Sequence, residues 1–170
     1  KKNLSRCVCT LRPKSEGGLF VGKEDERKSI LRLIAEYNPY LLDVEFNTIQ
    51  KDKKLATYLK KTKSKLLISW HDFKRTPNES QLRAKFNKMK KFSDVVKIVT
   101  VAKSVSDASR LLSLYSVKSK SKTIAFCMGE QGKFSRILCL HLGSPFTYVS
   151  LGKAIAPGQF SVDEIKSLEN

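Results

Sequence analysis

The sequence contains few cysteines, and their spacing does not suggest a zinc site. Its 170 residues include only four, with no CxxC pair among them: Cys7, Cys9, Cys127 and Cys139. The first two alternate along one candidate strand and therefore point to opposite faces, and the other two lie in apolar runs. We interpret all four as reduced, small apolar residues and expect no bound metal.

Long apolar segments are also missing. Apolar residues make up 41% of the chain, and no apolar run approaches the roughly 20 residues that a membrane-spanning helix needs. The first residues, KKNLSRCVCTLRP, are basic but have no long apolar centre of the kind found in a signal peptide. The sequence therefore predicts a cytoplasmic protein with no membrane partner.

Acidic residues are scarce relative to basic ones. There are 16 aspartates and glutamates against 33 lysines and arginines, a net charge of +17. Such an excess is typical of nucleic-acid binding, although it also attracts small anions. The lysines cluster in residues 51–65, 85–91 and 118–122, without the interleaved aromatic residues of a base-stacking surface. We interpret the first two clusters as solvated helix faces and expect no nucleic-acid partner, while a basic nucleic-acid-binding domain remains an alternative.

No glycine-rich phosphate-binding fingerprint follows any candidate strand, but short apolar runs alternate with amphipathic ones along the whole chain. The candidate strands are residues 6–12, 40–46, 65–71, 94–100, 123–128 and 146–150. Their nearly continuous apolar character favours a parallel sheet covered on both faces. The pattern predicts an α/β protein, with either an open doubly wound sheet or a barrel, for which eight strands are needed.

Helical periodicity fills the segments between these strands. Apolar residues share one helix face in three places: Ile30, Leu33, Ile34 and Tyr37; Leu82, Phe86 and Met89; and Val105, Ala108, Leu111, Leu112 and Tyr115. Near the end of the chain, SVDE at residues 161–164 has the spacing of a capping box and predicts the start of a last helix.

Several polar side chains stand at the ends of the candidate strands, where parallel α/β folds build their sites. They are Arg12 and Glu16 after the first strand, His71 at the end of the third, Arg136 after the fifth and Gln159 after the sixth. Lys97 stands inside the fourth, among valines and isoleucines. We expect these residues, which are far apart in sequence, to converge on one face.

Lys97 and His71 have the chemistry of a catalytic pair. Burial lowers the pKa of a lysine and favours the neutral amine, a nucleophile that forms a Schiff base with a ketone. A histidine takes and gives protons near neutrality, and Glu16 could fix its orientation. Each residue also has a plain structural interpretation, such as an ion pair between Lys97 and Asp94, or a simple turn at Gly17 and Gly18 after Glu16.

Six segments, in order, resemble the successive signatures of the type I 3-dehydroquinate dehydratase family. They are CTLRPKSEGG, LLDVEF, LLISWHDFKRTP, SDVVKIV, CMGEQGKFSRI and GSPFTYVSLGKAIAPGQFS. The resemblance implies a (β/α)8 TIM barrel, with residues 1–170 as a single barrel domain and about six of the β/α units visible. The first two strands of the barrel are expected to precede this sequence, so that the domain is incomplete at its N-terminus.

The same resemblance implies an enzyme, a lyase of the shikimate pathway to chorismate and the aromatic amino acids. It removes water from 3-dehydroquinate to give 3-dehydroshikimate, without metal or organic cofactor, usually as a homodimer. Lys97 would form the imine with the C3 ketone, and His71 would remove the C2 proton and protonate the departing C1 hydroxyl. Glu16 would orient His71.

The resemblance also implies how substrate is bound. Arg136 would clamp the substrate carboxylate, for which a planar guanidinium is well suited. Arg12 and Gln159 would bind the remaining hydroxyl and carboxylate groups.

One further alternative is a catalytically impaired descendant in which the missing strands are a native truncation. The retained Lys97, His71, Arg136 and Gln159 argue against it. Another Schiff-base barrel, such as an aldolase, would share the lysine but not the SEGG and APGQ segments.

Overall fold

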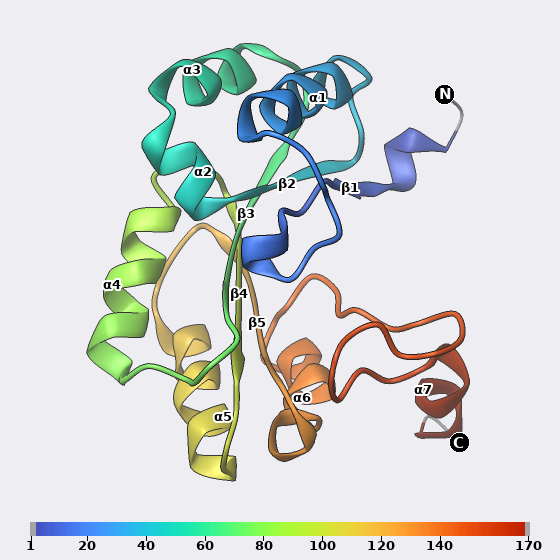
Figure 1. Cartoon of the computed structure of the whole chain (residues 1–170). Helices are drawn as coiled ribbons and strands as arrows, with labels where there is room; N and C mark the ends of the chain where they lie inside the picture. Colours follow the sequence, from blue (N-terminus) through green and yellow to red (C-terminus); the bar gives the residue numbers. More distant parts are fainter. Residues whose placement is uncertain (1–2, 169–170) are drawn as a thin grey trace. The chain divides into compact units, whose positions relative to one another are not determined.

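The computed structural model describes residues 3–168, and strands alternate with helices along them as the sequence predicts (Figure 1). The strands within this range are β1 (Val8–Thr10), β2 (Leu41–Glu45), β3 (Leu66–Asp72), β4 (Val95–Val101) and β5 (Lys122–Met128). The α-helices are α1 (Glu24–Glu36), α2 (Phe46–Lys51), α3 (Lys53–Lys61), α4 (Glu79–Met89), α5 (Val105–Leu112), α6 (Ser135–His141) and α7 (Val162–Leu168). Four short 3-10 helices complete the order: η1 (Leu4–Arg6), η2 (Lys14–Glu16), η3 (Ser113–Ser116) and η4 (Glu130–Gly132). The predicted α/β class is confirmed.

The strands form one parallel sheet in which they follow one another in sequence order, β1-β2-β3-β4-β5. Thr10 pairs with Asp43 on β2, and Glu45 pairs with Ser69 on β3. Every residue of β2 is buried, which is the burial expected of a parallel strand covered on both faces. This explains why the strands are nearly continuous apolar runs in the sequence, although β2 also buries Asp43 and Glu45.

The described residues fall into two compact units. One contains the residues up to Trp70 together with Lys88–Lys97, and the other contains His71–Asn87 and the residues from Ile98 onward. The boundary passes through β3 and β4, so each of these strands contributes to both units. The single domain expected over residues 1–170 stays a prediction.

In the first unit, α1 packs beside α3 (Figure 1) but not with the face that the sequence suggests. Leu33 and Tyr37 are 57% and 49% exposed, whereas the buried positions are Arg27, Leu31 and Ala35. Because an arginine occupies one of the buried positions, the pattern of apolar residues does not reveal which face of α1 is buried. Arg27 itself is fully buried.

Arg27 can be buried because its guanidinium is surrounded by hydrogen-bond acceptors. Its Nη1 donates to Glu45 Oε2 at 2.7 Å and to the Leu11 carbonyl at 2.9 Å. Its Nη2 donates to Glu24 Oε1 and to Thr48 Oγ1 at 2.7 and 2.6 Å. One side chain on α1 thus joins the end of β1, the end of β2 and the start of α2.

The helices of the second unit follow the sequence more closely. Leu82 and Phe86 of α4 are buried, as are Ala108 and Leu111 of α5. The capping box before α7 is confirmed, because Ser161 N donates to Glu164 Oε2 at 2.7 Å and Glu164 N donates to Ser161 Oγ at 3.1 Å.

The predicted strand at residues 146–150 is wrong. The segment is irregular, and within residues 3–168 its one ladder contact is an isolated bridge between Ser150 and Ser161. Its aromatic residues, which suggested a strand, form a cluster instead: Tyr148 contacts Phe126 and Phe146 with ring centroids 6.0 and 5.6 Å apart. Packing of the rings, and not pairing of the backbone, accounts for the composition.

Among residues 3–168, no helix is long and apolar enough to cross a membrane.

The contacts of Arg27 yield a prediction for stability. Arg27→Met keeps most of the side-chain length but leaves Glu45 buried without its closest charge partner, so we expect the free energy of unfolding to fall by about 3–5 kcal/mol. Chemical denaturation measures this change. Arg32→Met on the same helix is the matched control, because Arg32 lies over the Tyr58 ring at 5.7 Å and its loss should cost less than about 1 kcal/mol. Equal losses in the two variants would contradict the prediction.

Candidate functional site

The sheet register gathers polar side chains on one face of β1, β2 and β3. Side chains two residues apart on a strand share a face, so Asp43 and Glu45 point to the same side of β2. Glu45 is paired with Ser69 on β3, and Asp43 with Thr10 on β1, two residues before Arg12. Arg12, Asp43, Glu45 and Ser69 therefore converge from three neighbouring strands.

Arg12, Asp43 and Ser69 form a closed ring of hydrogen bonds. Arg12 Nη2 donates to Asp43 Oδ2 at 2.7 Å, and Arg12 Nη1 donates to Ser69 Oγ at 3.2 Å. The Ser69 hydroxyl in turn donates to Asp43 Oδ1 at 2.5 Å. Both carboxylate oxygens of Asp43 are engaged, which holds the group in one orientation.

Lys97 on β4 reaches the same carboxylate. Its Nζ lies 3.9 Å from Asp43 Oδ2, and the residue is only 7% exposed. The sequence prediction of a buried lysine in this strand is confirmed. Asp43 is an ion-pair partner of the ammonium form.

Glu45 links this cluster to Arg27. Its Oε2 accepts from Arg27, and its Oε1 lies 3.5 Å from Arg12 Nη1 without accepting a hydrogen bond from any described residue. Burial raises the pKa of Glu45, and Arg27 opposes that rise. Two arginines and two carboxylates thus neutralise one another inside the first unit.

Glu16 is placed by a tight turn after β1. It ends η2, Gly17 follows with φ of 77° in the left-handed region, and Gly18 comes next. A Cβ on Gly18 would stand 2.0 Å from the Arg12 carbonyl oxygen, closer than any side chain can approach. The two glycines therefore allow the loop to fold back against Arg12, as the sequence predicted for this turn.

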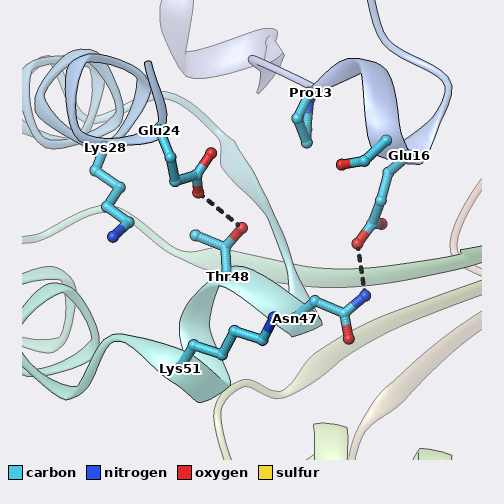
Figure 2. A pocket seen from close by; sticks show the side chains of 8 residues that line it. Pro13, Glu16, Glu24, Lys28, Asn47, Thr48 and Lys51 are labelled. Atoms are coloured by element: carbon cyan, nitrogen blue, oxygen red, sulfur yellow. Dashed lines mark hydrogen bonds between the residues drawn. The ribbon is translucent and has the colours of Figure 1, made fainter.

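Glu16 lies between the charged cluster and a cavity of about 380 Å³. Its Oε1 accepts from Asn47 Nδ2 at 2.9 Å, as Figure 2 shows, and its Oε2 lies 4.0 Å from Arg12 Nη1. Burial, reinforced by the nearby charge of Glu45, raises the pKa of Glu16 to about 7. The side chain therefore gains and loses a proton near neutrality.

Arg136 and Gln159 lie in the second unit. Arg136 on α6 is 2% exposed, its guanidinium carbon lies 4.6 Å from the centre of the Phe126 ring, and its Nη2 donates to the Pro157 carbonyl at 3.4 Å. Burial lowers the pKa of Arg136 to about 10. Its Nε is buried and donates to no described residue.

Gln159, two residues after Pro157, belongs to the same loop region. Its Oε1 accepts from the Ile155 backbone N at 3.0 Å. The arginine and the glutamine are thus both tied to residues 155–159.

His71 is the penultimate residue of β3 and also belongs to the second unit. It is half-buried and stacks on Phe73, with ring centroids 5.9 Å apart. The structure therefore brings Arg12, Glu16 and Lys97 together in the first unit, and ties Arg136 and Gln159 to one loop in the second. Convergence of the two groups, and the pairing of Glu16 with His71, stay predictions.

Sequence reasoning missed Asp43, Glu45, Ser69 and Asn47. A signal for two of them was present, because Asp43 and Glu45 are carboxylates two residues apart inside an apolar strand. The argument that singled out Lys97 applies equally to them. Ser69 and Asn47 are short polar residues with no sequence feature that separates them from others.

These observations define a class of protein: a parallel α/β fold with a buried lysine among fixed carboxylates and arginines on one face of its sheet. Among the residues that the structure describes, no group of three or more histidines, cysteines or acids could hold a metal ion. The chain belongs to the type I 3-dehydroquinase family, whose model matches residues 2–169.

Individual relatives agree with the family match. The 3-dehydroquinate dehydratase of Pyrobaculum aerophilum is 40% identical over 158 residues, which are 92% of this chain and 50% of the relative. The enzyme of the same name from Methanocaldococcus jannaschii is 34% identical over 165 residues, 95% of this chain and 74% of the relative.

A solved structure agrees as well. The crystal structure of type I 3-dehydroquinate dehydratase from Clostridium difficile, with covalently modified comenic acid, matches with a TM-score of 0.83 and 25% identity. The match covers 94% of this chain and 65% of that one. The predicted barrel-family fold is thereby confirmed, and the chain spans about half to three quarters of the length of these relatives.

The environment of Glu16 predicts how stability depends on pH. Its pKa is about 7 in the folded chain against an ordinary value of 4.5, so folding favours the protonated form. The stability gained from this preference is complete below about pH 4.5 and is lost as the pH rises through about 7. Glu16→Gln mimics the protonated acid at every pH. Relative to the original chain, the free energy of unfolding of Glu16→Gln should therefore increase by on the order of 2 kcal/mol as the pH rises from about 4.5 to about 7.

Chemical denaturation at several pH values measures this difference. Glu26→Gln is the control, because Glu26 is an exposed acid of α1, and its effect should stay constant with pH. A constant difference for Glu16→Gln as well would overturn the assignment of the raised pKa.

Proposed function

We propose that this protein is a 3-dehydroquinate dehydratase, a hydro-lyase that converts 3-dehydroquinate into 3-dehydroshikimate and water through a Schiff base on Lys97. The observation that carries the proposal is the burial of Lys97 beside the Asp43 carboxylate, in a chain that matches the family over residues 2–169. The relatives named 3-dehydroquinate dehydratase and the covalently modified ligand of the Clostridium difficile enzyme support it.

The reaction begins with attack of the neutral Lys97 amine on the C3 ketone. Protonated His71 gives its proton to the hydroxyl of the resulting carbinolamine, which leaves as water. The nitrogen lone pair then forms a protonated imine, which withdraws electrons from the neighbouring carbon. His71 then takes a proton from C2, and the electron pair moves toward the imine nitrogen to give an enamine. When the C1–oxygen bond breaks, His71 returns the proton to the departing hydroxyl, and water hydrolyses the remaining imine to free Lys97.

The other predicted residues bind and orient. Arg136 suits the substrate carboxylate, because its buried Nε donates to no described residue and a planar guanidinium offers a second donor beside it. Gln159 and Arg12 would meet the remaining oxygens of the substrate, and Glu16 would orient His71. No metal or organic cofactor takes part in this scheme.

We extend the proposal to the setting of the enzyme. The activity places the protein in the shikimate pathway to chorismate and the aromatic amino acids, with 3-dehydroquinate as its small-molecule partner. A homodimer in the cytoplasm is the expected state, by likeness to the family.

Borohydride trapping tests the Schiff base. Treating the purified protein with 3-dehydroquinate and borohydride should add one reduced adduct, seen by intact mass and mapped by peptide analysis to Lys97. Lys97→Ala should lose the adduct and the dehydration, whereas Lys103→Ala should keep both, because Lys103 is an exposed lysine just beyond the same strand.

Absence of any adduct on the folded protein would exclude the lysine mechanism and favour the impaired descendant. An adduct on another lysine would reassign the nucleophile. Salt-sensitive binding of nucleic acid in place of any reaction with 3-dehydroquinate would favour the basic binding domain.

Substitution of Arg136 tests substrate recognition. Arg136→Lys keeps the charge but loses the paired donors, so we expect KM to rise about 10- to 100-fold, which corresponds to the loss of one charge-assisted hydrogen bond. The value of kcat should change little. Arg83→Lys is the control, because Arg83 is a partly exposed arginine of the second unit paired with Glu79. An unchanged KM in Arg136→Lys would remove Arg136 from the substrate site.

A further inference from the structure

We propose that Asp43 is the counter-ion of the Lys97 nitrogen during the reaction, and that Arg12 and Ser69 are positioning residues that fix its carboxylate. The inference rests on the proposed Schiff-base function and deepens it. It assigns a role to Asp43 and Ser69, which the sequence did not single out, and a different role to Arg12.

The geometry of the carboxylate carries the inference. Asp43 Oδ1 accepts from Ser69 Oγ, and Oδ2 accepts from Arg12 Nη2, so rotation about the carboxylate axis breaks two hydrogen bonds. Lys97 Nζ lies 3.9 Å from Oδ2, beyond hydrogen-bonding distance but close enough for a strong charge interaction. Asp43 thus stabilises a positive charge on the Lys97 nitrogen without accepting a hydrogen bond from it.

Burial makes that interaction effective. Asp43 is 1% exposed and Ser69 is fully buried, so little water screens the charge. The other charged groups of the cluster in the first unit include Arg12, Glu16, Glu45, Arg27 and, paired with Arg27, Glu24. Of the two fully buried acids of this cluster, Glu45 pairs with Arg27 at 2.7 Å and lies 3.5 Å from Arg12, whereas Asp43 pairs with Arg12 at 2.7 Å and lies 3.9 Å from Lys97.

The chemistry of the imine requires such a group. The nitrogen must be protonated in the imine for it to withdraw electrons, and it becomes neutral when the C2 proton leaves and the enamine forms. A fixed carboxylate favours the protonated imine over the neutral one. Because Arg12 binds the same carboxylate oxygen, Asp43 stabilises the protonated nitrogen less strongly than a free carboxylate would. The electron pair can therefore still move onto the nitrogen when the enamine forms.

This arrangement also changes the interpretation of Arg12. Sequence resemblance assigned it to substrate binding, but its two terminal nitrogens donate to Ser69 and to Asp43 within the chain. A guanidinium held in this way orients the counter-ion, and any contact with substrate would be secondary to that task.

The test is the pH dependence of trapping at Lys97. Asp43→Asn keeps the shape and can still bond to Arg12 and Ser69, but it removes the charge. The upper pH limit of borohydride-reducible imine should then fall by about one unit or more, and dehydration near neutrality should slow about 10- to 100-fold. Ser69→Ala keeps the charge but removes the hydrogen bond to Asp43 Oδ1, so the carboxylate is held by Arg12 alone of these two residues. Turnover should then slow while the pH limit stays in place.

Asp52→Asn is the matched control. Asp52 lies in the same unit and caps α3 by accepting from Leu55 N at 2.8 Å, a bond that asparagine can also make. It should leave both the pH limit and the turnover unchanged. Circular dichroism of each variant verifies that it is folded.

The outcomes separate the two proposals. If the original protein gives no adduct at Lys97, the proposed function itself fails. If it gives the adduct but folded Asp43→Asn keeps the original pH limit, the counter-ion role is wrong. Should Asp43→Asn not fold, Asp43→Glu and Ser69→Ala decide. The inference would be overturned if the pH limit of Ser69→Ala differed from that of the original protein, or if either variant turned over as fast as the original protein.

Discussion

The first unit depends on one constraint, which is that a charge buried among apolar strands must have a partner of opposite charge. Arg27 and Glu45, both fully buried, satisfy it for each other at 2.7 Å. Their contact holds α1 against the ends of β1 and β2. It uses Glu45 Oε2, the oxygen that faces away from Arg12, so Arg12 is not needed to neutralise Glu45 and pairs with Asp43 instead. Asp43 in turn lies beside Lys97. The polar face follows from this sequence of pairings.

The same constraint explains why the strands tolerate so many polar residues. Asp43, Glu45, Ser69 and Lys97 would each be costly alone in a parallel sheet, but together their charges and hydrogen bonds are nearly satisfied. A site built in this way has fixed dipoles before substrate arrives, which is the condition for electrostatic catalysis. It also means that replacing any one of these four residues leaves its partner buried without a counter-charge or a hydrogen bond, which is destabilising.

Sequence reasoning succeeded where a residue conflicts with its surroundings or where local chemistry dictates structure. Lys97 stands out among valines, Ser161 and Glu164 form the capping box that their spacing predicts, and the continuous apolar runs became buried strands. It failed where a partner distant in sequence decides the outcome. The buried face of α1 depends on Glu45, which a helical pattern cannot reveal, and residues 146–150 use their rings for packing with Phe126. Register between strands, which brings Ser69 to Asp43, likewise has no local signature.

The contact of Gly18 with the Arg12 carbonyl bears on how this loop can vary over evolution or in a mutant library. Any side chain at position 18 must displace the backbone that carries Arg12, whereas the next residue, Leu19, is 90% exposed and meets no such limit. Tolerance to substitution should therefore change abruptly between two adjacent positions. A scan of the loop would find Gly18 intolerant to substitution, because its lack of a side chain preserves the path of the backbone at Arg12.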